Sequence, residues 1–144
     1  MKNWQSQAHV KWDCLYHVVI VPKYRRKVFF GKRRKEIGEV LRQLCRQKDI
    51  GLVEGNAMPD HIHMVLSIPP KYSVSMTLGY LKGKSAVSIL RNMTNANGTL
   101  FGRKFWARGY CVSTVGLDEE QIRAYVRDQQ KLDKKTDQGE LDLD

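Results

Sequence analysis

Residues 50–68 read IGLVEGNAMPDHIHMVLSI, and this stretch decides the fold. Its two ends are short runs of apolar and β-branched residues, which are typical of β-strands. Its middle, residues 56–60, holds the turn residues Asn, Pro and Asp. The stretch therefore predicts a hairpin of two antiparallel strands, at residues 50–58 and 61–68.

The second strand of this hairpin has two chemically different faces. Successive side chains of a strand point to opposite sides, so Ile62, Met64 and Leu66 should project together toward a core. His61 and His63 should then project together from the other side. Two imidazoles on one face of a strand can supply half of a metal site. The alternative is a pair of hydrogen-bonded structural histidines.

The remaining elements follow from the periodicity of apolar residues and from turn residues. They are a strand at 15–21, a helix around 37–45, a helix at 74–93, a strand at 110–115 and a helix at 119–132. With the hairpin, the order is strand, helix, strand, strand, helix, strand and a last helix. This order predicts an α+β ferredoxin-like (RRM-like) split βαβ fold, an antiparallel sheet with helices on one face. The two histidines then lie on the open face.

The last predicted helix carries the other candidate functional residues. It begins with a capping box, Asp118 and Gln121. Its spacing predicts a core-facing stripe of Ile122, Tyr125, Val126, Gln129 and Leu132. Gln129 is unusual there, because a leucine would normally serve, and Tyr125 lies one turn before it on the same face. If this face docks on the open side of the sheet, Gln129 can reach a metal held by the histidines. Packing is the alternative role for Tyr125.

Size and composition favour one domain. A chain of 144 residues with 42% hydrophobic residues can bury a proper core, and we place the domain at 1–132 and a flexible acidic tail at 133–144. We find no apolar run long enough to cross a membrane and no secretion signal. The three scattered cysteines form neither a zinc motif nor a disulfide framework. We therefore expect a cytoplasmic protein with reduced thiols that does not bind membranes.

The charge distribution favours a nucleic-acid partner. The net charge is +10, and eight of the thirteen residues from Lys23 to Lys35 are Lys or Arg, with aromatic residues between them. Cations neutralise phosphates and aromatic rings stack on unpaired bases, although a merely basic surface is the alternative. Phe105 and Trp106 can stack on bases, and the alternative for Trp106 is to anchor the core. The expected contacts to the DNA backbone are Lys23, Arg25, Arg26, Arg33, Arg34, Lys35, Lys82 and Lys84.

Several linked motifs give the chain a family resemblance. They read YH at 16–17, PKYRR at 22–26, MPDHIH at 58–63, LKGKS at 81–85, FW at 105–106, GY at 109–110 and YVRDQ at 125–129. In this order the chain resembles the small single-tyrosine transposases of the HUH superfamily, found in insertion sequences of the 200/605 family. The resemblance runs from about residue 14 to residue 132.

The resemblance implies a role for each residue of the site. It implies that His61 and His63 bind a divalent metal with Gln129 as the third ligand, and that Tyr125 is the nucleophile. The metal would be Mg²⁺ or Mn²⁺, and Mn²⁺ better matches mixed nitrogen and oxygen ligands. The implied enzyme is a DNA strand transferase that cleaves and rejoins single-stranded DNA at hairpin-marked ends through a 5′-phosphotyrosine. The resemblance also implies a homodimer. In some members of the family, the helix that carries the tyrosine completes the active site of the partner subunit.

Two alternatives stay open at this point. One is a non-catalytic module that binds single-stranded nucleic acid on the same fold, with the sheet as a stacking platform. It leaves the histidine pair and Gln129 without a purpose. The other is a related HUH nicking enzyme, such as a relaxase or a replication initiator. The short chain, without a further domain, favours the transposase.

Overall fold

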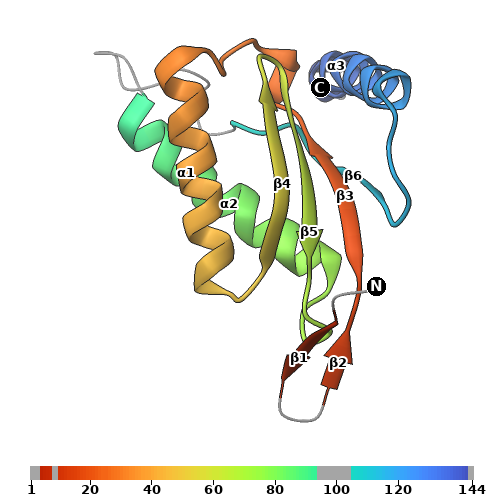
Figure 1. Cartoon of the computed structure of the whole chain (residues 1–144). Coiled ribbons are helices and arrows are strands. Elements are labelled where there is room, and N and C mark those ends of the chain that lie inside the picture. Colours follow the sequence, from red (N-terminus) through yellow and green to blue (C-terminus); the bar gives the residue numbers. More distant parts are fainter. Residues whose placement is uncertain (1–3, 8–9, 94–104, 143–144) are drawn as a thin grey trace.

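The computed structural model describes residues 4–7, 10–93 and 105–142 (Figure 1). The main sheet consists of β3 (Leu15–Ile20), β4 (Gly51–Met58), β5 (His61–Ser67) and β6 (Cys111–Ser113). Three helices accompany it: α1 (Gly31–Gln47), α2 (Val74–Met93) and α3 (Glu119–Asp142). A hairpin of β1 (Gln5–Gln7) and β2 (Val10–Trp12) precedes the sheet, and a 3₁₀ turn, η1 (Lys23–Arg25), follows β3.

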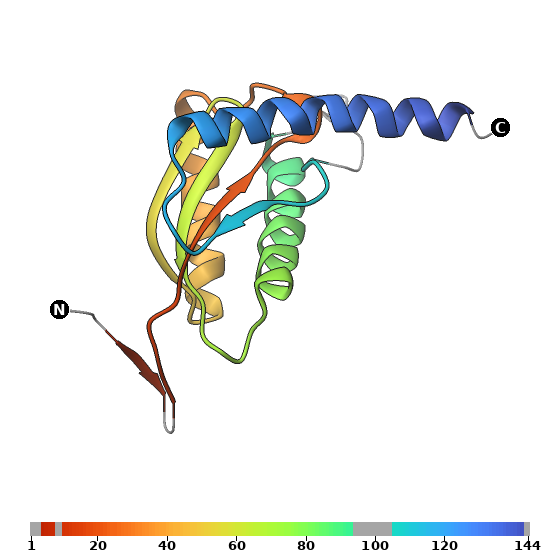
Figure 2. The same cartoon turned by 90° about the vertical axis from the view of Figure 1, so that its right-hand side faces the viewer.

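The sheet has the predicted topology. Its order is β4-β5-β3-β6, and every neighbouring pair is antiparallel. Helices α1 and α2 cover one face, and α3 crosses the other face (Figures 1 and 2). This confirms the α+β ferredoxin-like fold. The predicted hairpin is confirmed as well, because Met58 pairs with His61 and Asn56 with His63 across β4 and β5.

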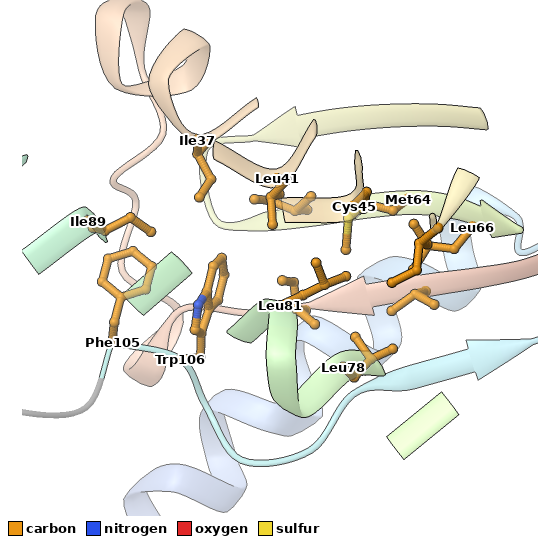
Figure 3. Close-up of a cluster of buried hydrophobic side chains, with 14 of the residues drawn as sticks. Ile37, Leu41, Cys45, Met64, Leu66, Leu78, Leu81, Ile89, Phe105 and Trp106 are labelled. Carbon is orange, nitrogen blue, oxygen red and sulfur yellow. The ribbon is translucent and has the colours of Figure 1, made fainter. Parts of the chain in front are cut away.

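The larger core lies between the sheet and helices α1 and α2 (Figure 3). The even-numbered side chains of β5, such as Met64 and Leu66, project into it as the alternation predicts. An aromatic cluster of Phe29, Phe105 and Trp106 closes one end, with ring centroids 4.8–5.9 Å apart. These two candidate base-stacking residues, at 105 and 106, are therefore buried core anchors.

A smaller apolar cluster docks α3 on the opposite face of the sheet. Ile122 and Val126 of the helix pack with Val19, Val21 and Ala107. The predicted helix face therefore does meet the open side of the sheet. The figures show α3 running across that face and extending beyond it (Figure 2).

The end of α3 differs from the prediction. We expected the helix to end at Leu132 before a flexible tail, but it continues to Asp142. The buried stripe of α3 continues to Asp133, which is only 6% exposed. This follows from the spacing of four, three and four residues along Ile122, Val126, Gln129 and Asp133, which keeps them on one helix face. Leu132 lies off this stripe and is 53% exposed, so its assignment to the core was wrong.

Two other boundaries were missed. The β1–β2 hairpin was not predicted, because strands of three residues are too short to show alternation. Helix α1 begins at Gly31, several residues before the apolar pattern starts at Ile37. The basic residues 33–35 therefore lie in the first turns of a helix. Within the ranges that the structure describes, no helix is long and apolar enough to cross a membrane.

Candidate active site

His61 and His63 line a pocket on the α3 side of the sheet. The pocket has a volume of about 460 Å³ and is bounded by strands β4 and β5, by Arg25 of η1 and by the first turns of α3. The register of the hairpin places Asn56 and Met58 beside the two histidines. The alternation that predicted a shared face for the histidines is thus confirmed.

A carboxylate fixes the ring of His61. Its Nδ1 lies 2.8 Å from Oδ1 of Asp60, and Arg25 Nε donates to Oδ2 of the same carboxylate at 2.8 Å. Burial alone would raise the pKa of Asp60, but the bonds from Arg25 and His61 hold this pKa below its ordinary value. An ionised carboxylate only accepts hydrogen bonds, so Nδ1 of His61 carries the proton. In the neutral imidazole, Nε2 is then the nitrogen with a lone pair.

His63 also offers an unused nitrogen. Its Nε2 is buried and has no hydrogen-bond partner among the described residues. Burial and the neighbouring His17 and His61 lower the pKa of His63 against the opposing effect of Glu54, so the ring is neutral near pH 7. The ring of His17 stacks on it, with centroids 5.6 Å apart. A buried, neutral and unpartnered imidazole nitrogen fits a metal ligand.

The residues that would complete a metal site are not all at this pocket. In the part of the chain that the structure describes, no three His, Cys, Asp or Glu residues gather to hold a metal. The residues of α3 that line the pocket are Glu119, Ile122, Arg123 and Val126. Tyr125 and Gln129 are not among the described residues that line it.

Tyr125 and Gln129 have other surroundings within this chain. Tyr125 packs against the smaller apolar cluster, and burial, together with Cys111 and Asp133, raises its pKa to about 12. Gln129 is buried, and its Nε2 donates to Oδ1 of Asp133 at 3.4 Å. The structure therefore brings the two histidines together but leaves the tyrosine and the glutamine outside their pocket.

Among the predicted DNA contacts, Arg25 and Lys82 have hydrogen-bond partners inside the protein. Arg25 pairs with Asp60, and Lys82 donates to the carbonyl oxygens of Ala107 and Gly109 at 2.8 and 2.7 Å. Burial lowers the pKa of Lys82, although Asp133 opposes this effect. The exposed members of the predicted set are Arg26, Arg33, Arg34, Lys35 and Lys84, and Lys23 is half-buried.

Sequence reasoning missed Asp60. It treated this residue as part of the turn between the strands, although the carboxylate holds His61 and Arg25. The available signal was its position directly before the His-x-His pair. Histidine ligands of metals usually donate their second nitrogen to such an acceptor.

The sequence itself places the chain among known proteins. The family model described as "Transposase IS200 like" matches residues 10–129. The chain belongs to the IS200-like transposase family. It is 44% identical over 138 residues to the transposase for insertion sequence element IS200 of Salmonella typhimurium, covering 96% of this chain and 91% of that protein. It is 30% identical over 115 residues to the ISDra2 transposase TnpA of Deinococcus radiodurans, covering 79% and 82%.

Solved structures agree with this assignment. A transposase structure from Deinococcus radiodurans matches with a TM-score of 0.70 and 26% identity, over 87% of this chain and 96% of that one. A REP-associated tyrosine transposase, bound to a REP hairpin, shares the fold with a TM-score of 0.54 and 10% identity, over 85% and 67%. An IS200-like transposase is a DNA strand transfer enzyme, so the family favours transposition over the relaxase and initiator alternatives.

Proposed function

We propose that this IS200-like transposase cleaves and rejoins single-stranded DNA at hairpin-marked ends through a covalent bond between Tyr125 and a 5′-phosphate. The observation that carries this proposal is that His61 and His63 line one pocket, where Nε2 of His63 is buried and unpartnered among the described residues. Helix α3, which docks on this side of the sheet, bears the tyrosine. The hairpin is supported by the REP-associated tyrosine transposase, which has the same fold and was solved with a REP hairpin.

The proposed chemistry is a phosphoryl transfer that conserves the phosphodiester energy. The phenol of Tyr125 gives up its proton as its oxygen attacks the phosphorus, the bond to the 3′-oxygen breaks, and this oxygen takes up a proton. The products are a 5′-phosphotyrosine and a free 3′-hydroxyl. A second 3′-hydroxyl can reverse the step and join a new strand. Because the pKa of Tyr125 is about 12 in its docked position, the phenol must be activated when it enters the pocket.

The histidine pair would hold the divalent metal. His61 and His63 would supply nitrogen ligands and Gln129 an amide oxygen, and Mn²⁺ suits this mixed set better than Mg²⁺. A bound divalent ion polarises phosphate oxygens and stabilises charge on the leaving 3′-oxygen. The fit rests on the unpartnered Nε2 of His63 and on the Nδ1 of His61, which is engaged by Asp60.

We further propose that the site is composite and is shared between two copies of the chain. Within one chain the α3 residues that line the pocket do not include Tyr125 or Gln129 in the described structure. A second protomer can present its α3 to the pocket, which brings both residues to the histidines. The exposed basic residues of α1 and Lys84 would then hold the DNA backbone.

A covalent-adduct assay tests the chemistry. The protein is incubated with a single-stranded hairpin oligonucleotide and Mn²⁺ or Mg²⁺, and an SDS-resistant protein–DNA adduct is expected. The adduct should vanish in Tyr125→Phe and on chelation of the metal. An adduct that persists in Tyr125→Phe would refute the nucleophile, and hairpin binding without any adduct would support the non-catalytic module instead.

Mixing two inactive variants tests the shared site. One variant carries Tyr125→Phe, and the other carries His61→Ala with His63→Ala. In a mixed dimer with shared sites, one site combines an intact histidine pair with an intact tyrosine, so the adduct returns. If each chain uses its own tyrosine, no protomer holds both halves and the mixture stays inactive.

A further inference from the structure

The carboxylate of Asp60, directly before the histidine pair, links His61 to Arg25, which lies 35 residues before Asp60 in the chain. Asp60 accepts from Arg25 Nε at 2.8 Å through Oδ2 and lies 2.8 Å from His61 Nδ1 through Oδ1. We propose that Asp60 and Arg25 are positioning residues, which fix the ring and the tautomer of His61 so that Nε2 is ready for a divalent metal. The inference rests on the proposed metal site and assigns the residues that prepare it.

The geometry defines which atom of His61 carries the proton. A guanidinium has only donors, so Oδ2 of Asp60 must accept. A carboxylate that is ionised at neutral pH also accepts through Oδ1, and Nδ1 of His61 must therefore donate. In the neutral imidazole, which is the form that a metal binds, Nε2 then keeps its lone pair.

Arg25 is itself held by an unusual backbone turn. Tyr24 and Arg25 have φ values of 62° and 54°, in the left-handed region that residues with a side chain rarely adopt. The N–H of Tyr24 donates to Oδ2 of Asp133 on α3 at 3.0 Å, which ties the turn to that helix. The arginine that we expected to contact DNA is thus directed at Asp60 by its backbone.

Replacing Asp60 with asparagine creates a conflict that can be measured. Asp60→Asn has one oxygen and one amino group, so the amino group must face either Arg25 or His61, which are both donors. The arginine charge favours the oxygen, so the amino group turns to His61 and its Nδ1 must accept. The proton then moves to Nε2. This nitrogen must lose that proton before it can bind a metal.

Two measurements test the proposal, the first on metal-free protein. Long-range ¹H–¹⁵N NMR of the imidazoles reports each tautomer, and we expect Nδ1–H for His61 in the wild type and Nε2–H in Asp60→Asn. Mn²⁺ titration followed by electron paramagnetic resonance should show affinity weakened about 10–100-fold in Asp60→Asn. Arg25→Met should weaken it less, because the carboxylate stays. The exposed Asp128→Asn, with the same charge change, is the control and should bind like the wild type.

The outcomes separate this inference from the proposed function. A wild-type protein that binds no Mn²⁺ would refute the proposed metal, while the NMR spectrum still reports the tautomer. Wild-type His61 in the Nε2–H form would overturn the positioning role, even if the variants fail to fold. The same conclusion follows if the wild type binds Mn²⁺ and Asp60→Asn binds it equally well. Unchanged affinity in Arg25→Met would remove Arg25 from the proposal.

Discussion

Replacing Asp133 with alanine should loosen α3 from the turn at η1. The carboxylate is 6% exposed and accepts from Tyr24 N–H at 3.0 Å and from Gln129 Nε2 at 3.4 Å. Asp133→Ala removes the acceptor and leaves the N–H of Tyr24 with no partner at this position. The effect should therefore appear in the stability of the whole domain and in the protection of this one amide.

The expected magnitude follows from these contacts. A hydrogen bond to a charged group contributes about 1.5–3 kcal/mol, and the bond at 3.4 Å adds little. Burial raises the pKa of Asp133, so desolvation offsets part of this stabilisation. We expect Asp133→Ala to lower the free energy of unfolding by about 1–3 kcal/mol, which corresponds to a melting temperature lower by about 3–10 °C.

Urea unfolding at pH 7, with hydrogen exchange of the Tyr24 amide, checks this prediction. Asp133→Asn is the matched control, because its amide oxygen can still accept from Tyr24, and it should lose less than about 1 kcal/mol. The urea m-value should stay the same in all three proteins if only stability changes. An alanine variant that is as stable as the wild type, with a protected Tyr24 amide, would refute the reasoning.

Two further predictions concern cysteine reactivity and DNA binding. Burial raises the pKa of Cys45 to about 11, so at pH 8 iodoacetamide should label the exposed Cys14 first and Cys45 only when the protein unfolds. Mass spectrometry of the time course checks this, and equal labelling of both would contradict the buried position. Lys84→Met should reduce the salt dependence of single-stranded DNA binding by about 0.7 in log–log slope for each lost phosphate contact. Lys82→Met should instead lower the melting temperature and leave the slope unchanged, because Lys82 donates to backbone carbonyls. A reduced slope in Lys82→Met would show that this lysine binds phosphate.

Patterns confined to one segment could be predicted from the sequence. The period of two in β5 placed Met64 in the core and the histidines on the opposite face, because a strand's alternation needs no knowledge of its neighbours. The apolar periodicity of α2 and the cap and turn residues that flank it likewise gave both ends of this helix, Val74 and Met93. Each of these features is fixed by residues close together in the chain.

Features that depend on distant partners were missed. From the sequence, Asp133 is expected to be a solvated acid. Its burial depends on a distant donor, the N–H of Tyr24, 109 residues earlier in the chain. Arg25 reads as part of a phosphate-binding cluster until the fold brings Asp60 beside it. The docking of α3 was expected, but the direction of Gln129 within it was not, because Asp133 offers a nearer partner.

The hairpin contains one extra residue that decides what stands beside the histidines. Leu52 pairs with Leu66 and Glu54 with Val65, so Val53 is a β-bulge with no opposite residue. Without this insertion, Leu52 and Glu54 would point to the same side of the sheet. The bulge lets Leu52 face the core while Asn56 and Met58 line the pocket. The presence of an extra residue at position 53, whatever its side chain, therefore determines which β4 side chains form one wall of the site.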